Sequence, residues 1–128
     1  MFSHVTIGTN APNRALVFYD RLHAPLGLAR IAQHGDAVGY AAAEDASPQL
    51  WIMPSFDGGP ASPGNGAMVA FQATNRDTVR LLHGIALANG GSCEGPPGLR
   101  LHYHPDYFGA YLRDPDGNKL CVVCHMPE

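Results

Sequence analysis

Hydrophobic and polar residues alternate along residues 2–9, which is the periodicity of a β-strand. The spacing then becomes helical, and one apolar stripe is formed by Ala15, Phe18, Tyr19, Leu22 and Leu26. Asn10 is a candidate cap for this helix and Gly27 a candidate stop. Three short strands are predicted next, at residues 28–32, 38–42 and 49–53.

Residues 54–65 interrupt both periodicities with a run rich in Pro, Gly and Ser, which predicts a loop joining two halves. The strand pattern returns at residues 67–73. A second helix follows, with Thr74 or Asn75 as its cap, and ends near Gly90. Its stripe is formed by Val79, Leu82 and Ala86.

Three more strands are predicted, around residues 99–103, 107–113 and 119–125, and residues 114–118 form a tight turn between the last two. Placing residues 4–7 against 68–71 brings the two helices into register, which indicates a duplicated unit. We therefore predict an α+β fold of two βαβββ repeats in a single domain, residues 1–128. Its halves are about 1–53 and 66–128, and 54–65 is the linker.

The composition limits the function classes. The chain has 128 residues, a net charge of −3 and a pI of about 6.1, so it lacks the basic character of a nucleic-acid-binding protein. No apolar run approaches the roughly 18–20 residues of a membrane span. Three cysteines without metal-site spacing and an N-terminus without signal-peptide features predict reduced thiols in a cytoplasmic protein.

Three stretches carry a resemblance to a known family. The first is residues 3–10 (Ser-His-Val-Thr-Ile-Gly-Thr-Asn), followed by residues 14–15 and 18–20. The other two are residues 66–71 (Gly-Ala-Met-Val-Ala-Phe) and residues 111–119 with their Asp-Pro-Asp-Gly-Asn turn. With the repeat order, the chain resembles the glyoxalase/bleomycin-resistance/dioxygenase (vicinal oxygen chelate) superfamily. The resemblance implies an open, barrel-like mixed sheet with the helices outside, and a homodimer. It leaves the activity open, because the family includes lyases, dioxygenases and drug-binding resistance proteins.

The resemblance also implies where a metal would bind, namely on the first and last strands of each half. Those positions fall at His4, near Trp51, at Met68 and at Cys121. His4 matches the family's first-strand histidine, but Met68 and Cys121 replace a histidine and a glutamate. Hard divalent metals prefer imidazole and carboxylate donors. Because Met68 and Cys121 offer a thioether and a thiol instead, this site is degenerate. We expect either no cofactor or one divalent ion (Zn, Ni, Mn or Fe) held by His4 and Cys121.

The remaining candidates are the lining of a small-molecule pocket and two histidines. The predicted lining is Phe2, Trp51, Met68, Tyr103, Tyr107, Tyr111 and Arg113. His4 and His104 are candidates for acid/base chemistry, and His102 would share a face with His104 on an extended strand. The alternatives are a solvated connection around His104 and a salt bridge at the rim for Arg113.

These residues predict a glyoxalase-like protein whose concave pocket binds a small, partly aromatic organic ligand without a metal. The alternative is a metal-dependent lyase or dioxygenase that uses His4 with non-standard ligands. A third hypothesis is a metal-free acid/base enzyme that uses His4 or His104. We expect no nucleic-acid or membrane partner.

Overall fold

The computed structural model describes residues 1–128. No helix in it has the length and hydrophobicity that a membrane span requires. The elements, in chain order, are β1 (Val5–Gly8), α1 (Pro12–His23), a short 3-10 helix (Ala24–Leu26), β2 (Leu28–His34), β3 (Ala37–Ala42), β4 (Leu50–Met53), β5 (Val69–Gln72), α2 (Arg76–Ala88), β6 (Ser92–Leu99), β7 (Phe108–Arg113) and β8 (Lys119–Cys124).

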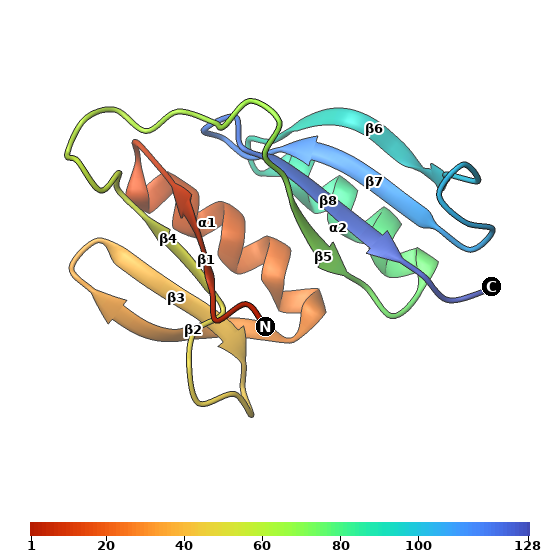
Figure 1. Ribbon diagram of the computed structural model, residues 1–128, viewed down its shortest axis with the longest axis horizontal. Helices are drawn as coiled ribbons and strands as arrows, with labels where there is room; N and C mark the ends of the chain where they lie inside the picture. Colours follow the sequence, from red (N-terminus) through yellow and green to blue (C-terminus); the bar gives the residue numbers. More distant parts are fainter.

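The eight strands form two four-stranded mixed sheets with the same topology. Their orders are β1-β4-β3-β2 and β5-β8-β7-β6, and the first pair of each sheet is parallel while the others are antiparallel. Each sheet has its own helix, and the linker arches over one end of the molecule (Figure 1). The duplicated α+β prediction is confirmed, with two open sheets that are not closed into a barrel.

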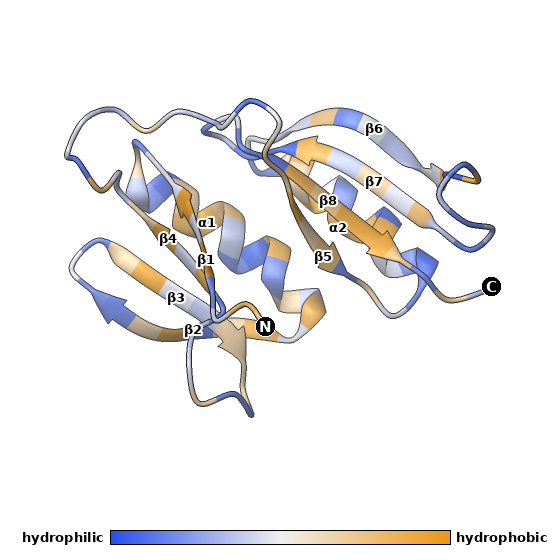
Figure 2. Cartoon of the chain, in the orientation of Figure 1, coloured by the Kyte–Doolittle hydropathy of each residue, from blue (hydrophilic) through white to orange (hydrophobic).

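The core lies between each sheet and its helix. The alternation seen in the sequence places Ile7 of β1 and Phe71 of β5 at equivalent positions in one cluster of 20 buried residues. Phe18 on α1 and Leu82 on α2 are fully buried in the same cluster. Each such side chain contributes about 1.5–3 kcal/mol. Hydrophobic positions accordingly concentrate on strands such as β1, β3 and β8 (Figure 2).

The two helices begin in different ways. Asn75 caps α2 as predicted, and its side chain accepts from the Thr78 amide at 2.8 Å. The prediction that Asn10 caps α1 is wrong, because the capping position is occupied by Ala11. The Asn10 side chain instead forms two hydrogen bonds with the backbone of Ala61, at 2.7 and 2.8 Å. It therefore ties the linker to the first half.

The strand predicted around residues 99–103 is also misplaced. The observed β6 runs from Ser92 to Leu99, and residues 101–103 form a turn. The strand contains Gly95, Pro96, Pro97 and Gly98, residues that normally mark loops. An edge strand tolerates proline, since one side of its backbone has no partner strand, and β6 is an edge of its sheet.

Candidate functional site

A cleft separates the two halves where β1 and β5 approach each other. Both strands are edges of their own sheets. The cleft is lined by Thr6, Ile7, Gly8, Ser62, Gly64, Ala67, Met68, Val69, Asn118 and Lys119. Residues of both repeats and of the linker therefore meet at this cleft.

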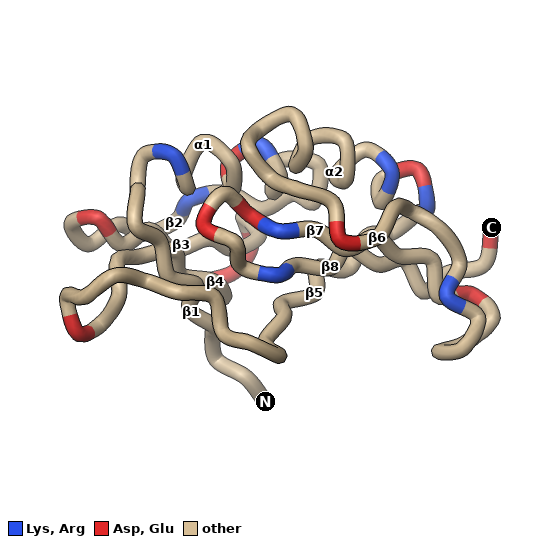
Figure 3. Tube along the Cα trace, turned by 90° about the horizontal axis from the view of Figure 1, so that it is seen from above, with Lys and Arg blue, Asp and Glu red and all other residues tan.

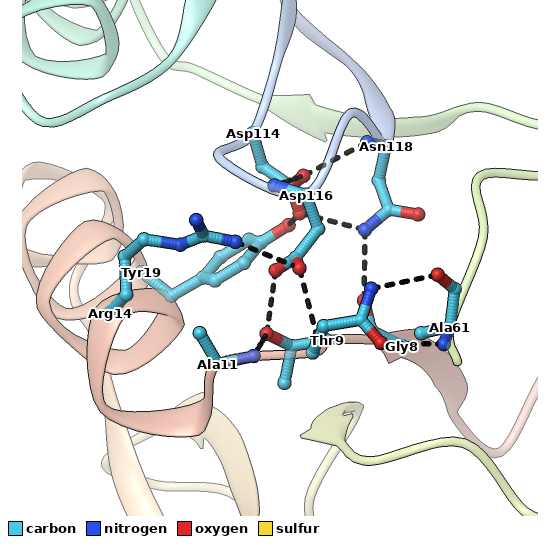
Figure 4. Close-up of polar contacts among 10 residues, drawn as sticks. Gly8, Thr9, Ala11, Arg14, Tyr19, Ala61, Asp114, Asp116 and Asn118 are labelled. Atoms are coloured by element: carbon cyan, nitrogen blue, oxygen red, sulfur yellow. Dashed lines mark hydrogen bonds and ion pairs between the residues drawn. The ribbon is translucent and has the colours of Figure 1, made fainter. Parts of the chain in front are cut away.

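One end of the cleft is fixed by the loop between β7 and β8. The Asn118 side chain donates to the carbonyl of Gly8 at 3.0 Å. Asp116 accepts from the Thr9 hydroxyl at 2.6 Å and pairs with Arg14 at 3.0 Å (Figure 4). The Asp116 carboxylate is nearly buried, with 4% of its side chain exposed. A charged hydrogen-bond network of this kind holds the end of β1 against the second half.

The concave face of the second sheet carries a cluster of two phenols and a thiol, formed by Tyr107, Tyr111 and Cys121. The Tyr107 hydroxyl lies 3.1 Å from the Tyr111 hydroxyl and 3.6 Å from the Cys121 sulfur. Burial raises the pKa of the Cys121 thiol and of both phenols. The thiol is fully buried, so it is covered by the phenols and held in its protonated form.

Glycines on neighbouring strands make room for these rings. A Cβ atom on Gly109 would lie 2.9 Å from the Tyr107 ring, and one on Gly95 would lie 3.1 Å from Cδ2 of Tyr111. Both distances are too short for an ordinary contact. The two rings therefore occupy space that a side chain at either glycine would restrict.

The first-half candidates are more exposed. His4 is exposed, and its Nδ1 lies 2.8 Å from the Ser3 hydroxyl. Phe2 is 81% exposed. Trp51 pairs with Thr6 across β1 and β4, and its ring stacks on His34 at a centroid distance of 5.6 Å. Trp51 therefore lies on the concave face, because Leu50 and Ile52 beside it point into the core.

Met68 and Arg113 approach the cleft from the second half. Met68 is 43% exposed and lines the cleft, and an adjoining hollow is lined by Met68, Arg113 and Lys119 among others. The Arg113 guanidinium donates to Glu94 and to the carbonyl of Gly117, each at 3.0 Å. Of the two interpretations of Arg113, the salt bridge is the one observed.

The histidine-rich segment is a turn, so His102 and His104 do not share a strand face. His102 packs against Tyr103, which is 59% exposed. His104 instead pairs with His125 at 2.9 Å. Its Nδ1 accepts from the Asp106 amide, so its Nε2 carries the proton and donates to Nδ1 of His125.

The donor set of this chain does not fit a resident metal. No group of three or more His, Cys, Asp or Glu side chains is arranged to hold an ion. Of the two candidate ligands, His4 contacts Ser3 and Cys121 is buried under phenols. A catalytic divalent metal ordinarily takes three protein ligands with an open position, so we derive no chemical step through one.

The sequence and fold can now be compared with known proteins. The sequence model of the Glyoxalase/Bleomycin resistance protein/Dioxygenase superfamily matches residues 1–122. The chain belongs to this superfamily. A comparison with curated proteins finds no match. Superfamily membership agrees with the duplicated fold described above.

Solved structures of similar proteins have the same fold as this chain. A glyoxalase/bleomycin resistance protein from Albidiferax ferrireducens T118 shares 37% identity, with 99% of each chain covered and a TM-score of 0.84. A glyoxalase-related enzyme from Fulvimarina pelagi shares 20% identity (97% and 87% covered, TM-score 0.74). A fosfomycin resistance protein from Listeria monocytogenes shares 16% identity (98% and 93% covered, TM-score 0.70). The last two show likeness of fold alone.

Two residues of the concave face escaped the sequence analysis. Arg100 and Lys119 both lie beside the ring of Tyr111, with centroid distances of 5.4 and 5.5 Å. Arg100 was missed because the strand was predicted around residues 99–103, whereas the observed β6 ends at Leu99 and leaves Arg100 directly after it. The alternation of β8 alone would have placed Lys119 on the same face as Cys121.

Proposed function

We propose that the protein binds a small organic molecule without the help of a metal, in the cleft between β1 and β5 and on the adjoining concave face. One observation carries the proposal. Where the family resemblance places metal ligands, Met68 presents half-exposed apolar surface and Cys121 is covered by phenols. Apolar contact area has thus replaced donor atoms, which suits retention of a ligand better than activation of a metal-bound one.

The proposed pocket would combine apolar and polar contacts. Met68 is a flexible, polarisable side chain that adapts to irregular ligand shapes. Trp51 offers a flat ring for stacking, and the Tyr107 and Tyr111 hydroxyls can orient a polar group of the ligand. Because Cys121 is covered and protonated, the ligand would meet phenol oxygens rather than a reactive thiolate.

We further propose that the protein forms a homodimer, as the resemblance implies. Phe2, Val5 and Met68 are 81%, 38% and 43% exposed, and they lie on or beside the two edge strands that flank the cleft. Light scattering coupled to size-exclusion chromatography would measure the mass. A monomeric mass at micromolar concentration would contradict the dimer without affecting the pocket.

The decisive experiment combines metal analysis with a ligand screen. Untagged protein, purified without chelator and reconstituted in turn with Zn, Ni, Mn and Fe(II), should hold no metal above background. A thermal-shift screen of small aromatic compounds should then find ligands that raise the Tm. About one equivalent of metal, lost in His4→Ala, would instead support the metal-dependent lyase or dioxygenase.

Variants locate the binding site. Met68→Ala and Trp51→Ala should weaken every screening hit about 5- to 10-fold, because each removes apolar contact area. Leu81→Ala is the matched control, since Leu81 on α2 is 52% exposed and lies outside the cleft. Hits whose affinities are unchanged in the Met68 and Trp51 variants would place the ligand elsewhere.

A further inference from the structure

The basic side chains of this chain fall into two groups. There are eight Lys and Arg residues, and five of them are paired with carboxylates. The paired residues are Arg14, Arg30, Arg76, Arg80 and Arg113. Arg21 donates to the Asn89 side chain. The two that remain are Arg100 and Lys119, and they lie beside the same ring, that of Tyr111.

Arg100 is held in place by its surroundings. Its backbone amide donates to the carbonyl of Tyr107 at 2.8 Å, and its guanidinium donates to the carbonyl of Pro96 at 2.8 Å. A Cβ atom on Gly95 would lie 3.2 Å from Nη2 of Arg100, and one on Gly98 would lie 3.1 Å from Nη1. The guanidinium therefore packs closely against the backbone of β6. Only one of its five N–H groups donates to a carbonyl oxygen.

Lys119 connects this arrangement to the cleft. It is the first residue of β8, it lines the cleft together with Met68, and its ammonium lies 5.5 Å from the centroid of Tyr111. Next to the ring, the hydroxyls of Tyr107 and Tyr111 are 3.1 Å apart. Two cations without counter-charges and the hydroxyl of Tyr107 thus lie around the phenol of Tyr111.

The two unpaired cations lie together in a chain whose net charge is negative. The net charge is −3, and basic and acidic positions otherwise intersperse over the loops and helices (Figure 3). Two uncompensated cations in a concave face concentrate positive potential where a ligand would enter. Cation–π contact with Tyr111 stabilises the two positive charges in part. It does not provide a carboxylate oxygen to accept hydrogen bonds from their N–H groups.

We propose that Arg100 and Lys119 bind the carboxylate of a small organic anion whose apolar body lies against Tyr111 and Met68. The inference rests on the proposed function, and it names the chemical class of that ligand. A guanidinium presents two parallel N–H groups to a carboxylate, and an ammonium adds a point charge. The phenol hydroxyls can donate to the same oxygens, because both remain protonated at neutral pH.

The test compares carboxylates with their neutral amides. Isothermal titration calorimetry would measure the Kd of benzoate, phenylacetate and 4-hydroxybenzoate against benzamide, phenylacetamide and 4-hydroxybenzamide. Each carboxylate should bind to the wild type at least about 10-fold more tightly than its amide does. Added salt should lower the affinity for the carboxylates. A preference for the amides, or no carboxylate binding at millimolar concentration, would overturn the inference. Amide binding at the Met68 site would leave the proposed function standing.

Variants separate ligand binding from a structural role. Arg100→Gln and Lys119→Gln should each weaken carboxylate binding about 10-fold and leave amide binding unchanged. Arg100→Lys should recover part of the lost affinity, because it restores the charge without the guanidinium fork. Arg21→Gln is the control, since Arg21 lies on α1 and contacts Asn89. Equal losses for carboxylates and amides, with a lowered Tm, would mean that the two cations only support Tyr111, and would overturn the inference.

Discussion

The hydroxyl of Tyr19 donates to Oδ2 of Asp114 at 2.5 Å, and this buried hydrogen bond joins α1 of the first half to the β7–β8 loop of the second. Tyr19 is fully buried and Asp114 is 4% exposed. Desolvation, reinforced by the charge of Asp114, raises the pKa of the Tyr19 phenol well above its usual value. Tyr19 therefore keeps its proton at neutral pH and remains the donor of this hydrogen bond, which ties together segments far apart in the sequence.

Tyr19→Phe should destabilise the protein by about 1–3 kcal/mol, because it leaves a buried carboxylate oxygen with one donor fewer. Asn118 still donates to the same oxygen at 3.0 Å, so the loss should stay within this range. Urea unfolding followed by circular dichroism measures the change. Tyr103→Phe, at a residue that is 59% exposed, is the matched control and should change little. Equal stabilities for the two variants would show that this hydrogen bond does not hold the halves together.

His23 should make the protein sensitive to acid. Its ring is fully buried between Tyr40 and Phe71, with centroid distances of 4.6 and 5.2 Å, and neither ring nitrogen has a hydrogen-bond partner. Burial lowers the pKa of His23 from 6.5 to about 4, although the charge of Asp20 opposes the shift. Between about pH 6.5 and 4, His23 is therefore protonated in the unfolded chain but not in the folded chain. The corresponding stability is present above pH 6.5 and is lost as the pH falls toward 4.

His23→Phe should remove this acid sensitivity, because an apolar ring needs no proton and leaves no buried nitrogen unpaired. The wild type should lose up to about 3 kcal/mol from this residue between pH 7.5 and 4, and the variant should keep it. Urea unfolding at several pH values measures how the free energy of unfolding depends on pH. His102→Phe is the control, since His102 is exposed. Parallel pH profiles for wild type and His23→Phe would contradict the prediction.

The three thiols should react at very different rates. Cys93 is exposed, with its sulfur 3.2 Å from Nε2 of His83, whereas Cys121 and Cys124 are 0% and 1% exposed. Thiolates are the reactive species, and burial raises the pKa of Cys121. Iodoacetamide should therefore modify Cys93 in the native protein, while the other two react only after denaturation. Peptide mass spectrometry over time provides the measurement, and rapid labelling of Cys121 would show that the phenols do not cover it.

Restoring donor atoms should create a metal site. The double variant Met68→His with Cys121→Glu places an imidazole and a carboxylate on the concave face that also bears His4. It should bind Ni²⁺ or Zn²⁺ more tightly than the wild type, as measured by calorimetry, and lose that binding when His4→Ala is added. If the double variant binds no more metal than the wild type, our placement of these residues around one concave face is wrong.

The sequence by itself determined the repeat and most of its elements. Periodicity of apolar residues identifies both helices and most strands, because burial on one face imposes a period of two or 3.6 residues on the chain. It also identified the opposite faces of Cys121 and Cys124, since Cys124 lies in the core and Cys121 lies against Tyr107. What failed was local: β6 is hidden by Pro96 and Pro97, which only an edge position tolerates.

The tertiary structure alone decided which side chains meet. Asn10 contacts Ala61 rather than capping α1, and His104 contacts His125 rather than His102. The pairing of Arg113 with Glu94 leaves Arg100 and Lys119 as the cations without carboxylates. Hydrogen bonds and ion pairs depend on distances of a few ångströms between strands that are far apart in the chain. Sequence spacing fixes the face on which a residue lies, but not its partner across the sheet.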